Sequence, residues 1–264
     1  MTVSLSEPLR TALAELARVP MLLVALDFDG TLAPEVDVPD DARAIPAARD
    51  AVLRLNELDA TRVALVSGRA MASLIHVSRL PDDVLLIGSH GIEQRLDHPD
   101  DRLALGAHEL ERVEVLKRVL TRIADGHDEV WVEEKPAGFA LHTRLATPEA
   151  AQQAHHDALR ETAAALGELT VREGKNVLEF SVRSTTKGEG IELLRQYTGA
   201  DAVLFAGDDV TDEDGFAALQ PHDVGIKVGA GDTAASFRVG GPEQLAHALG
   251  ALADARAAAL ARGR

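Results

Sequence analysis

The sequence predicts an α/β fold in which a parallel-sheet core is interrupted by a smaller α+β domain. Two observations lead to this prediction. Near both ends of the chain, short unbroken apolar segments alternate with segments of helical periodicity, which is typical of strands covered on both faces in a parallel sheet. In the middle of the chain, apolar and polar residues alternate instead, as in an antiparallel sheet with one open face. We therefore predict a core of residues 1–106 and 184–264, with an inserted domain at 107–183.

The first part of the predicted core alternates helices with strands. Leu9, Leu13 and Leu16 share one helical face, and the segment that begins at Leu22 is continuously apolar. Alternation at this spacing implies parallel strands joined by right-handed crossovers. The expected elements are a helix at Ser6–Arg18, a strand at Leu22–Leu26, a helix at Asp40–Ala60, a strand at Arg62–Val66, a helix ending near Arg79 and a strand at Val84–Gly88.

The inserted domain is predicted to contain two helices and two pairs of strands. The turn signal Pro136-Ala137-Gly138 separates two alternating segments and predicts a hairpin. The expected elements are a helix at Ala107–Asp125, strands at Glu129–Glu134 and Phe139–Leu145, a helix at Pro148–Leu166, and strands at Leu169–Arg172 and Val177–Val182.

After the insertion the pattern of the core resumes. We expect a helix at Lys187–Thr198, strands at Ala202–Ala206 and Val224–Val228, and a closing helix at Pro242–Ala255. The last residues, Ala257–Arg264, are expected to fray.

Composition excludes several classes of protein. The 264 residues include no cysteine, which rules out disulfides and thiolate metal sites and fits a reducing cytoplasm. No segment has the pattern of a signal peptide or a membrane span. The formal charge of -16 argues against nucleic-acid and anionic-membrane partners. We expect a cytoplasmic protein, with a monomer as the working assumption, that concentrates cations locally if its substrate is anionic.

Carboxylates follow two of the predicted core strands. Asp27 and Asp29 come directly after the strand that begins at Leu22, and Asp208 follows the strand Ala202–Ala206. Reactive groups of parallel sheets lie past the carboxyl ends of the strands, and paired carboxylates repel unless a cation or a proton lies between them. Three carboxylates suit Mg²⁺. The alternative is a helix N-cap at Asp29, since Asp and Thr are common capping residues.

Two further positions complete a set suited to phosphoryl transfer. Ser67-Gly68-Arg69 offers a hydroxyl and backbone N–H groups for an anion, although Ser67 is equally a helix-capping residue. Lys187 opens a helix, where the helix dipole disfavours a cation, so another task is indicated. No G-x-x-x-x-G-K-[ST] nucleotide cradle is present.

The set Asp27-Phe28-Asp29-Gly30-Thr31, Ser67, Lys187 and Gly207-Asp208-Asp209 with Asp212 resembles the four motifs of the haloacid dehalogenase superfamily of aspartate-nucleophile phosphatases. The resemblance implies a Rossmann-like core with a cap domain. It implies that Asp27 attacks phosphorus and that Asp29 is the acid and base. Ser67 and Lys187 would hold the phosphoryl oxygens. Asp27, the Asp29 carbonyl and Asp208 would bind Mg²⁺, with Asp212, and by extension Asp209, orienting the waters of the metal.

Further segments resemble the trehalose-6-phosphate phosphatases of this superfamily. They are Gly88-Ser89-His90-Gly91-Ile92-Glu93, Glu133-Glu134-Lys135, Leu141-His142-Thr143-Arg144, Gly174-Lys175-Asn176-Val177-Leu178-Glu179 and the residues Gly207–Asp214. The resemblance implies a sugar-phosphate substrate bound by Arg69, His90, Glu133, Lys135, Arg144, Lys175 and Glu179. The alternative for the five residues of the inserted domain is an ordinary exposed sheet face, where charged residues are common.

Three functions remain open at this point. The first is Mg²⁺-dependent hydrolysis of trehalose 6-phosphate. The second keeps the chemistry and changes the substrate to sucrose phosphate, mannosyl-3-phosphoglycerate or another sugar phosphate, because the core performs the reaction and the cap selects the sugar. The third is a non-catalytic sugar-phosphate sensor, which predicts the loss of a nucleophile, acid, lysine or metal ligand that this chain retains.

Overall fold

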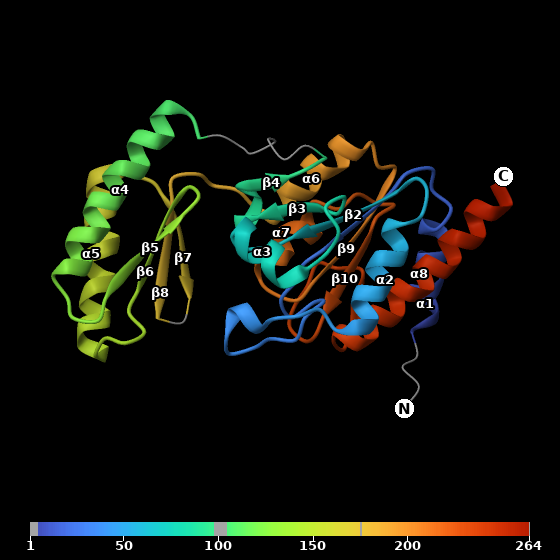
Figure 1. Cartoon of the computed structure of the whole chain (residues 1–264), viewed down its shortest axis with the longest axis horizontal. Coiled ribbons are helices and arrows are strands. Elements are labelled where there is room, and N and C mark those ends of the chain that lie inside the picture. The colour runs from blue at the N-terminus through green and yellow to red at the C-terminus, as the bar shows by residue number, and fades with distance from the viewer. Residues whose placement is uncertain (1–4, 98–104, 175, 264) are drawn as a thin grey trace. The chain divides into compact units, whose positions relative to one another are not determined.

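The computed structural model describes residues 5–97, 105–174 and 176–263 and divides into two compact units. Unit 1 consists of Met1–Arg102 and Thr185–Arg264, and unit 2 of Leu103–Ser184. Each unit has its own sheet (Figure 1). Among the described residues, no helix combines the length and the apolar character that a membrane span requires.

The sheet of unit 1 is parallel except at one edge. Its strand order is β11-β10-β9-β1-β2-β3-β4, and only β4 runs antiparallel to its neighbour. The first strand, β1, lies in the middle and pairs with β2 and β9, with Leu26 opposite Ala206. The strands are β1 (Leu22–Leu26), β2 (Thr61–Val66), β3 (Leu85–Gly88), β4 (Glu93–Arg95), β9 (Ala202–Gly207), β10 (Val224–Val228) and β11 (Phe237–Val239).

Helices cover both faces of this sheet. Successive strand residues point to opposite sides, and in β1 both sets of side chains are apolar and buried. Leu22, Val24 and Leu26 belong to a core packed by α1 (Glu7–Leu16), α2 (Pro46–Asn56), α3 (Met71–Ser78) and α8 (Pro242–Gly263). Leu23 and Ala25 belong to a second core packed by α6 (Lys187–Thr198) and α7 (Thr211–Ala217). Figure 1 shows α1, α2 and α8 gathered together. The strand β1 is fully buried, which agrees with its unbroken apolar sequence.

Unit 2 is an antiparallel sheet with two helices on one face. The strand order is β5-β6-β8-β7, and α4 and α5 pack against it through a core that includes Leu116, Ala154, Leu141 and Phe180. Successive residues of each strand point to opposite faces, so one set packs on the helices and the other set lies on the open face. The elements are α4 (Ala107–Asp125), β5 (Trp131–Lys135), β6 (Gly138–His142), α5 (Pro148–Leu166), β7 (Thr170–Gly174) and β8 (Val177–Ser181).

The structure confirms the predicted α/β class and most of the elements, and it corrects some boundaries. The helix expected at Asp40–Ala60 begins at Pro46, after a separate 3-10 turn, η1 (Pro39–Asp41). Ile45 is its N-cap, with an extended backbone suited to the residue before a proline. Three short elements, β4, α7 and β11, were not predicted from the sequence, because a few residues show no clear periodicity.

The expectation that Ala257–Arg264 frays is wrong for the residues that the structure describes, since α8 continues to Gly263. Two features favour the longer helix. Alanine and arginine are strong helix formers. The guanidinium of Arg256 is buried and donates hydrogen bonds to the carbonyls of Ala17, Val19, Pro20 and Ala60 and to Thr61 Oγ1. Arg256 therefore anchors the second half of α8 to the start of the sheet.

Candidate active site

The end of β1 places Asp27 in a buried position beside Lys187. The side chain of Asp27 follows the last strand residue, and its backbone N–H donates to the carbonyl of Ala206 at 2.9 Å. Lys187 Nζ donates to Asp27 Oδ1 at 2.8 Å and to Asp212 Oδ1 at 2.7 Å. Asp27 and Lys187 are only 4% and 3% exposed. The lysine that opens α6 is thus held away from the helix axis and in contact with two acids.

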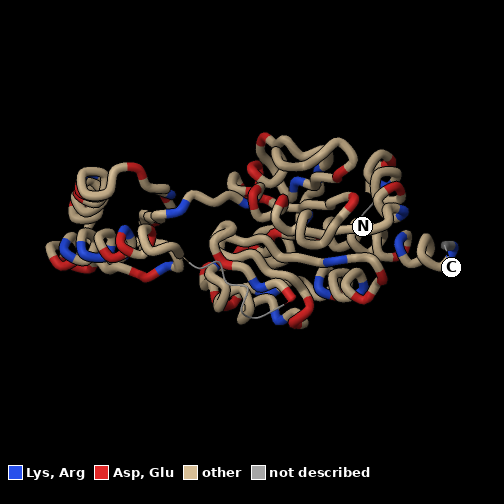
Figure 2. The backbone as a smooth tube through the Cα atoms, turned by 90° about the horizontal axis from the view of Figure 1, so that it is seen from above, with Lys and Arg blue, Asp and Glu red and all other residues tan. Residues whose placement is uncertain are grey.

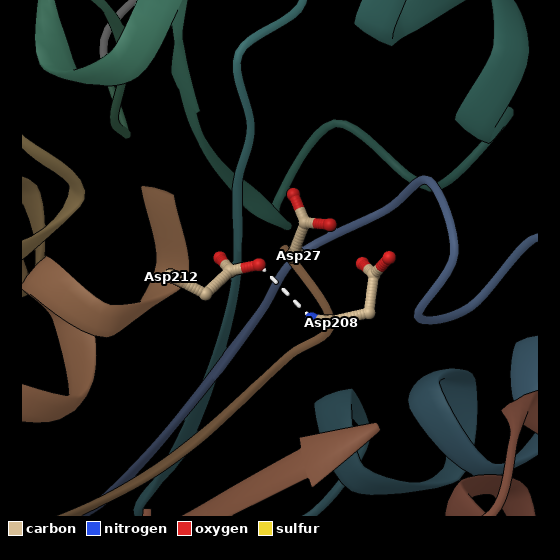
Figure 3. Close-up of side chains that lie close together, drawn as sticks. All are labelled: Asp27, Asp208 and Asp212. Carbon is tan, nitrogen blue, oxygen red and sulfur yellow. Dashed lines mark hydrogen bonds between the residues drawn. The ribbon is translucent and has the colours of Figure 1, made fainter. Parts of the chain in front are cut away.

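Asp208 and Asp212 complete an acidic group at the same end of the sheet. Each of Asp27, Asp208 and Asp212 offers one carboxylate oxygen, and these three atoms lie within 4.8 Å of one another. Figure 3 shows the three side chains close together: Asp27 directly follows β1, Asp208 directly follows β9, and Asp212 lies in α7. Asp208 follows β9, the neighbour of β1 in the sheet. The sequence-based prediction that Asp208 lies beside Asp27 is therefore confirmed.

Glycines make room for these carboxylates. A Cβ built on Gly30 would lie 2.0 Å from Asp208 Oδ2, and one on Gly207 would lie 2.2 Å from Asp212 Cγ. Gly30 also has a φ of +70°, which residues with a side chain adopt rarely. Any larger residue at either position would displace an acid of the group.

Asp212 is held by three donors and is 0% exposed. Its Oδ2 accepts from the backbone N–H groups of Asp208 at 3.0 Å and Asp209 at 2.9 Å. Its Oδ1 accepts from Lys187. Asp212 thus accepts three hydrogen bonds from these donors. Asp208 Oδ1 accepts one, from Thr31 Oγ1 at 2.9 Å. Asp208 therefore retains more free acceptor capacity than Asp212.

The electrostatics of the group fit a divalent cation. Burial raises the pKa of the Asp27 carboxyl, and Asp212 adds to this against the lowering effect of Lys187. Burial also raises the pKa of Asp208. Burial opposes the charge of Lys187, but Asp27 and Asp212 outweigh it and raise the pKa of that ammonium. One ammonium thus faces three carboxylates, and hard oxygen donors in this excess match a divalent metal ion.

The carboxylate of Asp29 pairs with Arg69. Arg69 Nε donates to Asp29 Oδ2 at 2.5 Å, and Nη2 donates to Asp29 Oδ1 at 2.7 Å. The sequence predicts a cation or a shared proton beside Asp27 and Asp29. In the structure each side chain also has a basic partner, Lys187 for Asp27 and Arg69 for Asp29. The alternative interpretation of Asp29 as a helix N-cap is wrong, since the next helical segment that the structure describes begins at Pro39.

Ser67 lies at the end of β2 and is 1% exposed. Its Oγ accepts the N–H of Arg69 at 3.2 Å, while α3 begins only at Met71 with Ala70 as its N-cap. The alternative interpretation of Ser67 as the cap of this helix is therefore wrong. His90 is close by: its N–H donates to the Ser67 carbonyl at 3.0 Å.

The predicted residues of unit 2 lie mostly on its open face. Glu133 Oε1 accepts from Lys135 Nζ at 2.6 Å, and Glu133 Oε2 lies 2.8 Å from His142 Nε2. Glu133 and Glu179 both stand opposite Ala140, so they share a row across the sheet. His142 also stacks on Trp131, with ring centroids 5.0 Å apart. Arg144 is exposed. The prediction for Lys175 lies outside the described residues.

Basic residues at the acidic group of unit 1 stand out against the charge of the whole chain. Asp and Glu occur in both units (Figure 2), and the formal charge is -16. Lys187 and Arg69 each contact an acid that follows β1, so carboxylates already compensate their charges. A bound divalent cation would add the positive charge that an anionic group requires there.

Residues 25–243 match the family model described as trehalose-phosphatase. The chain belongs to the trehalose-phosphatase family. This membership confirms the resemblance stated from the sequence. The matched residues begin within β1 and end in the first turn of α8, and they include both the acidic group and the whole of unit 2.

Relatives and solved structures agree with the trehalose-phosphatase assignment. The trehalose-6-phosphate phosphatase of Escherichia coli is 34% identical over 227 residues, which cover 81% of this chain and 80% of that protein. A bifunctional trehalose-6-phosphate synthase/phosphatase of Thermoproteus tenax is 34% identical over 86% of this chain, which spans only 31% of that protein. The solved trehalose-6-phosphate phosphatase of Aspergillus fumigatus is 25% identical with a TM-score of 0.70, covering 93% of this chain and 97% of that one.

Two residues of this site received no role from the sequence. Thr31 belongs to the first motif, and its Oγ1 donates to Asp208 and, at 3.4 Å, to Asp27 Oδ2. Lys227 is 4% exposed within the apolar strand β10. A lysine in a continuous apolar strand is itself a signal, because lysine is almost never fully buried without a partner.

Proposed function

We propose that this trehalose-phosphatase family member hydrolyses trehalose 6-phosphate to trehalose and phosphate in a reaction that depends on Mg²⁺. The observation that carries the proposal is the buried Asp27, which contacts Lys187 and lies within 4.8 Å of oxygens of Asp208 and Asp212. An exposed carboxylate in water is a weak nucleophile, whereas one fixed beside a lysine and a metal site can attack a phosphoryl group.

The proposed reaction has two steps. In the first, an oxygen of Asp27 attacks phosphorus, the bond between phosphorus and the sugar oxygen breaks, and Asp29 gives its proton to that oxygen. In the second, Asp29 takes a proton from water, the water oxygen attacks phosphorus, and the bond to Asp27 breaks. The residues return to their starting state. Each oxygen of Asp29 accepts one hydrogen bond from Arg69 and keeps a second lone pair that can receive the proton.

Three groups support these steps. Ser67 and Lys187 would hold the phosphoryl oxygens as they gain negative charge. Asp27, Asp208 and the backbone carbonyl of Asp29 would hold Mg²⁺, with Asp212 and Asp209 orienting its waters. Bound Mg²⁺ supplies positive charge that stabilises the charge on the transferred phosphoryl group.

Recognition of the sugar is assigned to Glu133, Lys135, Arg144, Lys175 and Glu179 of unit 2, with Arg69 and His90 in unit 1. The mixture of acids and bases suits hydroxyl groups, which both donate and accept hydrogen bonds. The formal charge of -16 supports a small-molecule substrate over nucleic acid or an anionic membrane.

The test is phosphate release from a panel of sugar phosphates by the full chain with Mg²⁺. The expected preference is for trehalose 6-phosphate over glucose 6-phosphate, sucrose phosphate and mannosyl-3-phosphoglycerate. Asp27→Asn should abolish release from every substrate while circular dichroism stays unchanged, because an amide is a poor nucleophile. Release of even a few per cent of the wild-type amount by Asp27→Asn would contradict the covalent mechanism, and no release by the wild type from any of them would favour a sensor.

A further inference from the structure

Lys227 is a buried cation near the acidic group, and the reaction proposed above gives it no role. It lies in β10, opposite Gly207 of β9, directly before the loop that carries Asp208. Its side chain is 5% exposed. A buried ammonium is costly to retain unless its partners use its charge. Its contacts therefore indicate what it does.

Both contacts of the ammonium fix the loop between Asp208 and α7. Lys227 Nζ donates to the carbonyl of Asp209 at 3.3 Å and to Glu213 Oε1 at 3.2 Å. The N–H of the same Asp209 donates to Asp212 Oδ2 at 2.9 Å. The backbone of Asp209 is thus held on one side by Lys227 and on the other by Asp212, between two members of the acidic group.

Glu213 ties the ammonium to a second segment. Its Oε2 accepts the N–H of Ala234 at 2.8 Å, in the loop that follows β10. Burial opposes the charge on Glu213, but the bonds from Ala234 and Lys227 hold its pKa below the ordinary value. Both oxygens of Glu213 are therefore fixed by contacts, and Glu213 limits where the Lys227 ammonium can lie.

We infer that Lys227 is a positioning residue for the metal site: through Asp209 and Glu213 it sets the loop that places the Asp208 and Asp212 carboxylates. The inference rests on the metal site of the proposed function. In metal sites, residues that hydrogen-bond behind the ligands commonly matter about 10- to 100-fold for metal affinity. Lys227 acts one step further back, because it contacts Asp209 and Glu213, the chain neighbours of Asp208 and Asp212.

The inference is testable because removal of Lys227 has opposite effects on Mg²⁺ affinity under two explanations, positioning of the loop and simple charge repulsion. A cation near a Mg²⁺ site repels the metal ion, so its removal alone would strengthen binding. A positioning role predicts weaker binding instead. A role confined to folding predicts lower stability with unchanged affinity. The sign of the change in Mg²⁺ affinity therefore separates the three possibilities.

The experiment titrates Mg²⁺ alone into the metal-free full chain by isothermal titration calorimetry. Lys227→Met keeps most of the apolar stem, and we expect it to weaken Mg²⁺ binding by roughly 10- to 100-fold. Lys227→Arg keeps the charge and should recover part of the affinity. Lys227→Gln serves if Lys227→Met does not fold, because it also removes the positive charge, and it should weaken binding in the same direction. Arg256→Met is the matched control, because Arg256 is also a buried cation that bonds to backbone carbonyls.

Each outcome bears on the inference. Weaker binding by Lys227→Met, with Arg256→Met at wild-type affinity, supports it. Unchanged or tighter binding by a folded Lys227→Met overturns it. Because no substrate is present, the titration does not depend on which sugar phosphate is hydrolysed. If the wild-type chain itself binds no Mg²⁺, the metal site of the proposed function is wrong, and the inference about Lys227 is withdrawn with it.

Discussion

Arg69 holds the carboxylate of Asp29 by two parallel hydrogen bonds, from Nε at 2.5 Å and from Nη2 at 2.7 Å. A two-point contact of this kind fixes the plane of the carboxylate as well as its position. Arg69 Nη1 also donates to Ser73 Oγ at 3.1 Å, so the guanidinium is itself anchored to α3. The proposed acid and base is therefore oriented by an arginine that the sequence associates with the substrate.

Arg69→Lys should lower kcat for trehalose 6-phosphate by as much as roughly a hundredfold, because an ammonium cannot make the two-point contact and the acid becomes misplaced. An aryl phosphate is the control substrate, since its leaving group needs little protonation. Formation of the aspartyl phosphate from the aryl substrate, followed as a burst in rapid-quench measurements, should change little. Equal losses on the two substrates would assign Arg69 to binding of the phosphate.

Metal dependence is the second prediction. Activity should require Mg²⁺ and disappear in EDTA, and Ca²⁺ should inhibit, because its looser and higher coordination misplaces the nucleophile and the phosphate. Asp208→Ala should raise the Mg²⁺ concentration needed for half-maximal activity. The measurement is phosphate release across a Mg²⁺ titration. Full activity of the wild type in metal-free buffer would be incompatible with the proposed site, and an unchanged requirement in Asp208→Ala would remove that ligand.

Glu179→Ala tests recognition by unit 2. Losing a hydrogen bond to a charged group costs about 1.5–3 kcal/mol, which is roughly a ten- to more than hundredfold loss in kcat/KM for trehalose 6-phosphate. Hydrolysis of a small aryl phosphate should barely change. Similar losses on both substrates would show that Glu179 supports folding or the reaction itself.

The single tryptophan gives this experiment an independent readout. Trp131 is the only tryptophan in the chain, it is 40% exposed, and it stacks on His142, whose Nε2 lies 2.8 Å from Glu133. Trehalose binding to this face should therefore alter the tryptophan fluorescence, and inorganic phosphate alone should not. Fluorescence that stays constant at saturating trehalose would count against sugar contact on this face.

Arg256→Met should lower stability without changing activity. The substitution leaves the carbonyl of the buried Ala17 without the donor that it has in the wild type, and an unpaired buried group costs about 1–3 kcal/mol. A cost near 2 kcal/mol corresponds to a fall in Tm of roughly 4–8 °C, measured by calorimetry. A wild-type Tm would show that water replaces the guanidinium at this carbonyl.

The sequence predicted the parts of the fold that have long or unbroken patterns. The strand at Leu22–Leu26 and the helices Ala107–Asp125, Pro148–Leu166 and Lys187–Thr198 have the predicted limits. The three-residue strands β4 and β11 did not emerge, since three residues carry no period. The sequence did not predict the end of α8. In the sequence Arg256 is one polar residue of an alanine-rich tail, and its stabilising hydrogen bonds are made to distant segments.

The candidate site was predictable as a set of residues but not as a set of contacts. Strand ends pointed to Asp27 and Asp208, because parallel strands bring their carboxyl ends to one edge. The pairing of Asp29 with Arg69 depends on side-chain directions 40 residues apart. The bond from Thr31 to Asp208 joins residues 177 apart. Contacts between residues so far apart in the sequence depend on how the whole sheet packs. Local sequence patterns therefore cannot predict them.

The position of β1 in the middle of the sheet has a consequence for how the protein folds. Its pairing with β2 spans only residues 27–60, whereas its pairing with β9 must wait until unit 2 has been synthesised. Lys187 and Asp27, 160 residues apart, meet only at this late closure, and non-local closures of this kind are slow. During synthesis, the proposed nucleophile Asp27 therefore emerges long before Lys187, and the contact between them can form only after unit 2 and the start of α6 have been made.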